Sequence, residues 1–359
     1  RYVSVTGVQT CALPISTKSN FSGVSMNEDK TRASFDQIGF VYSNKIGNNT
    51  SLRFVNFGFN YHKSKNFNRL FSMGGALDNM SQSFQLAQEM ERYGLTESEF
   101  NAILDAKNPY TKYWNQLPVL GVMGVRTGVV DWFNDPEKNI HAPWGWNGFN
   151  NNFFSKETGG ISQYDFNVSF NIEDRVYLGA TLGVYDVNYD RYTSYTENLN
   201  DDKGADNGGY TLDNYYRLEG TGLDLKLGVI VRPIESSPFR LGFAVHTPTW
   251  YDLRESYNAT LSSDILAYEK PYIQTLSDFL VTPEYDYLTY DYNLTTPWKF
   301  NVSAGTTFAG AVAVGAEYEY QDYSSSKLKD VDGYELGYQP SVENYLKGVH
   351  TFRIGMETR

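Results

Sequence analysis

The chain has 359 residues, of which 16% are aromatic, and it carries a net charge of −12. Such acidity argues against nucleic acid as a partner, because phosphate backbones are bound by clustered Lys and Arg. One cysteine excludes a disulfide framework and a cysteine-based zinc site.

The first segment, Arg1–Ser16, is similar over its whole length to a translated sequencing adapter. We therefore predict that residues 1–16 are a non-native leader and that residues 17–359 are the natural part. The chain also stops at Thr358 and Arg359 within an alternating strand pattern, so we expect an internal fragment of a longer protein. The alternative is an ordinary N-terminal strand that buries Cys11.

Two strands are predicted next, near 35–43 and over 52–62. Ile38, Phe40 and Tyr42 share one face of the first strand. In the second strand, Val55, Phe57, Phe59 and Tyr61 alternate with polar or small residues.

Residues 63–163 are predicted to be a loop insertion that contains short helices. Met80, Phe84, Ala87 and Met90 recur at helical spacing, and Gly94 ends that helix. Thr96 and Glu99 form a capping box for a second helix, and a third short helix is expected over 110–117. Their apolar faces either pack together as a lid or line a groove for a lipophilic ligand. The groove residues would be Phe84, Leu86, Met90, Phe100, Leu104, Trp114 and Leu117.

Seven further strands follow the insertion, and in all of them apolar residues alternate with small or polar ones. We call this alternation the phase rule. The clearest is 164–172, where Tyr164, Phe166, Val168, Phe170 and Ile172 alternate with Asp, Asn and Ser. The others are expected over 176–189, 223–231, 241–246, 298–308, 312–320 and 350–357. Many run longer than the usual soluble strand of about 5–6 residues.

Charged residues on the polar face decide how these strands are oriented. The sequence has no run of about 18 apolar residues, so no transmembrane helix is expected, but a transmembrane strand needs only about 9–11 residues. A Lys or Arg facing lipid at mid-depth costs about 2–4 kcal/mol, whereas a wet lumen costs little. We therefore predict an antiparallel transmembrane β-barrel with its apolar face toward lipid, rather than a soluble sandwich. The polar lumen residues would be His62, Asp165, Asp224, Lys226, His246, Lys299, Glu317, Glu319 and Arg353.

The connections alternate in length, which favours the barrel. Short ones are expected at 44–51, 173–175, 233–238 and 309–310, and long ones at 63–163, 190–214, 251–290 and 324–346. Outer-membrane barrels have short periplasmic turns and long extracellular loops. An aromatic girdle is expected near the long-loop ends. It would comprise Tyr185, Tyr189, Tyr192, Trp250, Tyr251, Trp298, Tyr318 and Tyr320.

Chemical motifs are scarce. His62 and His246 fall on the lumen phase near the long-loop ends, which leaves an outer-membrane hydrolase as a third hypothesis, but no serine-hydrolase or metal-ligand spacing accompanies them. Asp224 and Lys226 either pair with each other or meet an acidic head group. No catalytic residue, metal site or cofactor is predicted.

Several segments resemble the outer-membrane protein transport family, the FadL-type long-chain fatty-acid transporters. They are Gly220–Pro233, Phe239–Tyr251, Thr296–Gly305 and Val314–Tyr320. The resemblance covers roughly residues 30–62 and 160–359, while the helical insertion matches only in position. It implies a fourteen-stranded barrel, of which about nine or ten strands are present here. The family's N-terminal plug and its Asn-Pro-Ala motif are absent, so no gate residue is carried over.

The sequence therefore predicts a monomeric channel in the bacterial outer membrane for passive uptake of hydrophobic compounds. The resemblance implies long-chain fatty acids as substrate, with membrane lipid and a hydrophobic small molecule as partners, no nucleic acid, no cofactor and no enzymatic activity. The main alternative is a surface binding or adhesion barrel without transport.

Overall fold

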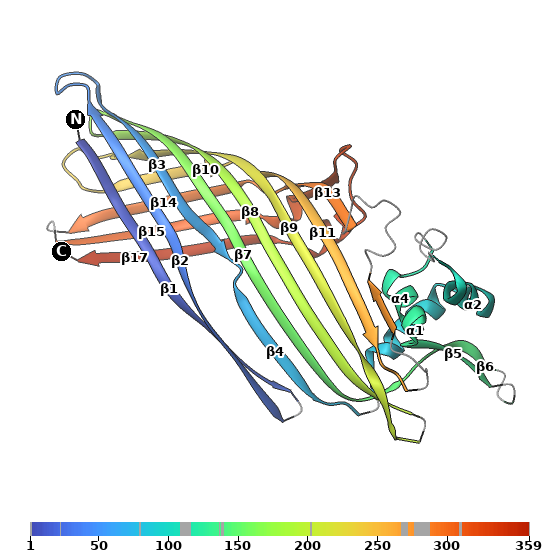
Figure 1. The fold of residues 1–359 in the computed structure, drawn as a ribbon. Coiled ribbons are helices and arrows are strands. Elements are labelled where there is room, and N and C mark those ends of the chain that lie inside the picture. Colours follow the sequence, from blue (N-terminus) through green and yellow to red (C-terminus); the bar gives the residue numbers. More distant parts are fainter. Residues whose placement is uncertain are drawn as a thin grey trace.

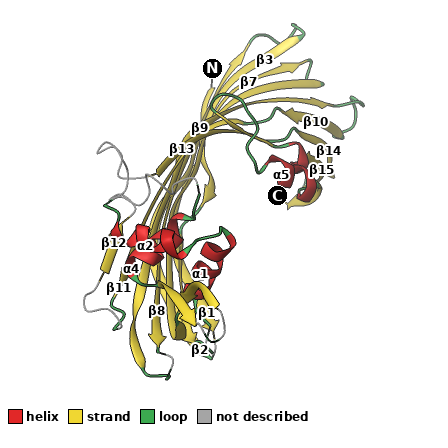
Figure 2. Cartoon of the chain, turned by 90° about the vertical axis from the view of Figure 1, so that its right-hand side faces the viewer, coloured by secondary structure: helices red, strands yellow, loops and turns green. Residues whose placement is uncertain are grey.

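The computed structural model describes residues 2–21, 23–78, 80–107, 116–135, 137, 140–201, 203–266, 272–275, 288–308 and 311–358. An antiparallel sheet of 15 strands dominates it and curls into an open half-barrel (Figures 1 and 2). Along the main path the strands follow the order β1-β2-β3-β7-β8-β9-β10-β14-β15-β17, so β1 and β17 form the two edges. The predicted all-β architecture is confirmed, with more strands than the nine or ten that the phase rule found.

The main path consists of the following strands: β1 (Tyr2–Phe21), β2 (Val24–Lys45), β3 (Leu52–Asn66), β7 (Asn147–Ile172), β8 (Val176–Asn200), β9 (Asp206–Val231), β10 (Arg240–His246), β14 (Lys299–Phe308), β15 (Val312–Asp322) and β17 (Gly348–Thr358). Five more extend it: β4 (Arg69–Ala76), β11 (Trp250–Ser263), β12 (Tyr272–Thr275), β13 (Leu288–Thr295) and β16 (Lys327–Asp330). Residues 2–16, predicted to be foreign, lie in β1 and pair with β2; their origin stays a prediction.

The chain is interrupted by a proline at two neighbouring places in the sheet, between β10 and β11 and between β13 and β14. Both β10 and β11 pair with β9, with Pro248 between them, and Pro297 separates β13 from β14. Proline cannot donate to the ladder, which explains the interruption. Threonines bridge it: Thr247 Oγ1 accepts from the Leu225 amide at 3.0 Å, and Thr296 Oγ1 accepts from the Thr249 amide at 2.8 Å.

One face of the sheet carries an exposed apolar band near the short turns. On β9, Leu223 and Leu225 are 45% and 37% exposed, whereas Asp224 between them is 3% exposed. The band covers Tyr164–Ile172 of β7, Val176–Val184 of β8 and Leu223–Val231 of β9, or about nine residues of each strand. We call this the outer face, and the opposite face, toward which the sheet curls, the inner wall.

The strands continue far beyond this band. On β8 the outer-face residues change to Asp186, Asn188 and Asp190, and the strand runs on to Asn200, adding about 16 residues or roughly 50 Å. The prediction of a long loop over 190–214 is therefore wrong, because β8 runs to Asn200 and β9 begins at Asp206. In this extension the outer face is polar and the inner face mixes aromatic, aliphatic and polar residues, so the alternation with an apolar outer face, which marked the strands, disappears.

Three helices and a hairpin form a lid inside the predicted insertion. The helices are α1 (Gln82–Arg92), α2 (Glu97–Asp105) and α4 (Val119–Thr127), and the hairpin is β5 (Val130–Asp135) with β6 (Ile140–Gly145). The Thr96–Glu99 capping box is present, and Gly94, at φ +78°, follows the end of α1 as expected. The helix predicted over 110–117 lies largely outside the described residues.

The insertion is smaller than predicted, because strands enter it from both sides. β3 extends to Asn66, β4 follows it, and β7 already begins at Asn147. The connection between β15 and β17 contains η2 (Tyr323–Ser325), β16 and α5 (Gln339–Tyr345). Gln339 fixes this segment by accepting from the Leu328 amide at 2.9 Å and donating to the Ser326 carbonyl at 3.0 Å.

Candidate functional site: the inner wall and its lid

A charged network lies on the inner wall at the height of the apolar band. Lys226 Nζ lies 2.8 Å from Asp165 Oδ1 and 3.7 Å from Asp224 Oδ1, and Tyr185 donates its hydroxyl proton to Asp224 Oδ2 at 2.7 Å. Asp165 is on β7 and the other two charges are on β9, so the ion pair spans the intervening strand β8. We call Asp165, Asp224 and Lys226 the lysine network.

A glycine makes this crossing possible. Gly183 of β8 stands opposite both Asp165 and Asp224 in the register. A Cβ atom at Gly183 would lie 2.2 Å from Asp224 Oδ1 and 3.2 Å from Lys226 Nζ. Only a residue without a side chain leaves room for these charges to meet over the middle strand.

The two histidines that suggested a hydrolase lie apart. His62 Nδ1 lies 3.0 Å from Asn60 Nδ2 and 3.7 Å from Asp165 Oδ2. His246 stands opposite Lys226 on one side and Lys299 on the other. Both belong to the polar wall, His62 on β3 and His246 on β10. Within the described ranges, no group of three or more His, Cys, Asp or Glu side chains is placed to hold a metal ion.

The remaining predicted lumen residues form a second network nearer the open edge. Arg353 bonds to Glu317 and lies 3.2 Å from Glu319, and Lys299 Nζ lies 3.8 Å from Glu319. Asn301 donates to both carboxylates at 3.1 Å. The structure thus brings the predicted lumen charges together in two clusters on one wall.

An apolar ring separates the lysine network from the lid, and the phase rule did not single it out. Ile161, Val187, Leu253 and Tyr292 lie at one level across β7, β8, β11 and β13, with Gly220 of β9 between Val187 and Leu253. Val187 and Leu253 are 5% and 6% exposed. The sequence hardly signals this ring, because Val187 and Leu253 occupy the inner-facing positions of their strands, which carry polar residues within the apolar band.

Tyrosines line the lower side of the ring. Tyr185 and Tyr251 meet edge to face with their ring centroids 5.7 Å apart. Both residues were predicted for the outer girdle, but they lie on the inner wall. Trp250 and Trp298, at 48% exposure each, do lie on the outer face at the edge of the band. The aromatic residues therefore serve two surfaces, which composition alone cannot separate.

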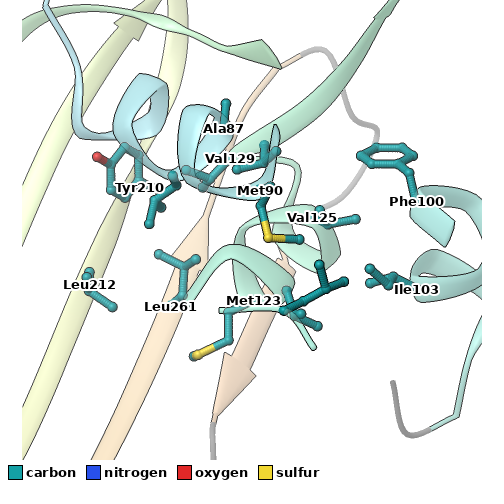
Figure 3. Packing of buried hydrophobic residues seen from close by; sticks show 14 of the residues in the cluster. Ala87, Met90, Phe100, Ile103, Met123, Val125, Val129, Tyr210, Leu212 and Leu261 are labelled. Atoms are coloured by element: carbon teal, nitrogen blue, oxygen red, sulfur yellow. The ribbon is translucent and has the colours of Figure 1, made fainter. Parts of the chain in front are cut away.

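The lid packs onto the inner wall at the far end of the extension. Its core joins helix residues Met90, Ile103 and Met123, all fully buried, to Leu212 of β9 and Leu261 of β11 (Figure 3). Gly121 lets α4 approach α1, because a Cβ there would lie 2.2 Å from Met90 Sδ. The lid and the strand extension therefore share one hydrophobic core.

A buried carboxylate ties α1 to the strands. Glu197 of β8 is fully buried and accepts hydrogen bonds from the hydroxyls of Tyr210 at 2.5 Å and Tyr195 at 2.9 Å. It also accepts from the Gln82 amide at 3.1 Å, in the first turn of α1, where a negative charge is favoured. Burial, followed by the adjacent Glu197 charge, raises the pKa of both tyrosines, which lie in the extension outside the apolar band.

The groove residues predicted from the sequence occupy different places in the lid. Leu86, Met90, Phe100 and Leu117 are buried in the shared core. Phe84 is half-buried against Trp144, Leu104 is 42% exposed, and Trp114 lies outside the described residues. The four buried side chains have the arrangement expected of a packed lid. Their role in holding a ligand stays a prediction.

Comparison with known proteins finds matches only among solved structures. Models of protein families do not match the chain, and a search of curated proteins finds no match. No helix among the described residues is long and apolar enough to span a membrane. Among solved structures, the toluene transporter TodX of Pseudomonas putida is similar, with a TM-score of 0.40 and 12% identity over 99% of this chain and 70% of that one. A TodX deltaS2S3 mutant, a monoaromatic hydrocarbon channel, gives a TM-score of 0.40 and 11% identity over 99% and 69% of the chains.

Proposed function

We propose that this chain forms the wall of a bacterial outer-membrane channel through which hydrophobic compounds pass by diffusion. The observation that carries the proposal is that, at one height of the sheet, apolar side chains lie on the outer face and charged side chains lie on the inner wall. Apolar residues face outward over about nine residues per strand, while the lysine network faces inward. A soluble protein would bury the apolar face, and here it is the more exposed one.

The inner wall supports a hydrophobic cargo. Below the lid, a compound would meet the apolar ring of Val187, Leu253, Ile161 and Tyr292 before the charges of the lysine network. Apolar side chains with a few polar groups at one end are the usual lining of a small-molecule site. Long-chain fatty acids, the class implied by the family resemblance, are the first cargo to test, with membrane lipid as the surroundings of the outer face.

Uptake by cells tests this function. In a strain that lacks its own gene, we expect the full-length gene to restore uptake of at least one of two long-chain probes, a fluorescent fatty acid or the corresponding alcohol. Val187→Gln, which puts an amide into the apolar ring, should reduce uptake several-fold. Asn188→Gln, one residue along β8 but on the outer face above the band, should leave uptake unchanged.

The rival function, a surface binding or adhesion barrel, draws on the long extension and its lid. It predicts that deleting the gene leaves uptake intact and reduces attachment of cells to surfaces. Heat-modifiable migration on gels would verify that each variant is folded. Uptake that is equal in the deletion strain and the complemented strain would reject transport in favour of the rival.

A further inference from the structure

A ligand descending from the apolar ring meets carboxylates before it meets a cation. Tyr185 and Tyr251 form the level below the ring, and Asp165 and Asp224 form the next level, both opposite Gly183. Lys226 stands one level further down, opposite Thr181 and His246. The end of an elongated molecule seated in the ring would therefore face the two carboxylates.

The Lys226 ammonium is already paired with carboxylates of the protein. Its ammonium lies 2.8 Å from Asp165 and 3.7 Å from Asp224, and 5.7 Å from the centre of the Tyr185 ring. Its side chain is 18% exposed. Two carboxylates surround one ammonium, so the network carries an excess negative charge.

Several other cations of this wall also contact protein groups, whereas Lys65 of β3 lies opposite Ile161 at the level of the ring. Lys299 and Arg353 are held by Glu317 and Glu319. Arg240, at the turn end, lies over the Tyr177 ring, and Arg191, above the apolar ring, lies over the Tyr216 ring. The Tyr216 hydroxyl in turn donates to Glu255 at 2.9 Å. Below the ring, the described part of the wall thus offers a carboxylate ligand acidic neighbours and lysines that are already paired with carboxylates.

We infer that the channel selects hydrophobic compounds without a free carboxylate, and that Asp165 and Asp224 are the residues that determine this specificity. The inference rests on the proposed function and narrows its substrate class to uncharged compounds, such as long-chain alcohols and esters. A carboxylate would lose its water and gain no ion pair, because Lys226 and Lys299, the lysines at that depth in the described wall, are already held by Asp165, Asp224 and Glu319. Discrimination here comes from repulsion of the wrong ligand.

Three probes of equal chain length test the inference: dodecanol, methyl dodecanoate and dodecanoate, supplied at a pH where the last is an anion. Initial uptake is measured in the deletion strain carrying the full-length gene. We expect dodecanol and the ester to enter at least about tenfold faster than dodecanoate. The ester shows whether charge, rather than a hydroxyl donor, is what the wall distinguishes.

Freeing the lysine should reverse this preference. Asp165→Asn together with Asp224→Asn leaves Lys226 unpaired, so dodecanoate uptake should rise by about tenfold relative to dodecanol. The matched control is Asp186→Asn with Asp252→Asn, which removes two charges from the outer face just above the band and should not change the ratio.

Each outcome decides the matter. If the wild type carries dodecanoate as fast as dodecanol, the inference is overturned while the proposed function stands. An equal shift in the control variant would assign the effect to overall charge and also overturn it. If none of the three probes enters faster than in the deletion strain, the proposed function itself fails. The wild-type comparison needs no variant, so a misfolded double variant leaves the inference testable.

Discussion

Single residues decide whether charges can be accommodated on the inner wall. The lysine network spans three strands only because Gly183 places no side chain between Asp165, Asp224 and Lys226. Partial disruption of such a network is costly, since a buried charge that loses its partner keeps its desolvation penalty. Alternation in the sequence places these three charges on one face, where the register also has them, but the ion pair across β8 depends on a glycine that the alternation pattern treats as neutral.

Gly183→Ala should therefore destabilise the barrel. The added methyl group would displace Asp224 or Lys226, and we expect a loss of about 2–4 kcal/mol in the free energy of unfolding. Urea unfolding in phospholipid vesicles, followed by tryptophan fluorescence, measures the change. Gly179→Ala is the matched control, because a Cβ at Gly179 on the same strand and face meets nothing within 4 Å. Equal stability of the two variants would contradict the steric role of Gly183.

Helices and strands could be predicted where apolar residues recur at a regular spacing, and were missed where that spacing is absent. The strands of the apolar band and the two capped helices followed from periodicity and from Thr96 and Glu99. The halves of β8 and β9 beyond the band did not, because the outer face turns polar at Asp186, Asn188 and Asp190 and the apolar phase of the alternation is lost. The lid's attachment was also hidden, since Glu197 is a single acidic residue in an acidic chain and only its contacts reveal its burial.

The attachment of α1 to β8 and β9 should weaken at alkaline pH. The pKa of Tyr210 is raised, so the folded state holds the phenolic proton more tightly than the unfolded state does. Its contribution to stability is fully present below the ordinary tyrosine pKa of about 10 and is lost as the pH rises above that value. Emission from the described lid tryptophans, Trp132, Trp144 and Trp146, should shift to longer wavelength as the lid detaches between about pH 10 and pH 12.

Two phenylalanine substitutions control this experiment. Tyr210→Phe removes the more buried of the two titrating tyrosines beside Glu197 and should weaken the alkaline transition, while lowering lid stability at pH 7 by about 1–2 kcal/mol. Tyr192→Phe removes a tyrosine whose pKa is also raised, but which bonds Asp213 on the outer face away from the lid. A transition that is lost in Tyr192→Phe and kept in Tyr210→Phe would disprove the attachment role of Glu197.

At the scale of the whole molecule, the sheet has two edge strands and one large apolar surface. The edge strands need hydrogen-bonding partners, and the apolar surface needs an apolar environment. β17 exposes Phe352, Ile354 and Met356 at 76%, 84% and 72%. Unpaired strand edges are not tolerated in hydrocarbon, so the edges at β1 and β17 must be covered for the sheet to cross a membrane. The curl of the sheet and the outward apolar band both favour closure around the inner wall.

A pair of adjacent residues tests this orientation. Val168 lies at the centre of the band on β7, facing outward, and Ser169 faces the inner wall. In vesicles, Val168→Arg should lose about 2–4 kcal/mol of stability, whereas Ser169→Arg should lose much less, because water reaches the lumen. Urea unfolding in the vesicles gives both values, and far-UV circular dichroism of the wild type with and without lipid gives the reference. Equal losses, or a wild type that is as folded and stable in lipid-free buffer as in vesicles, would mean that the apolar band faces protein and not lipid.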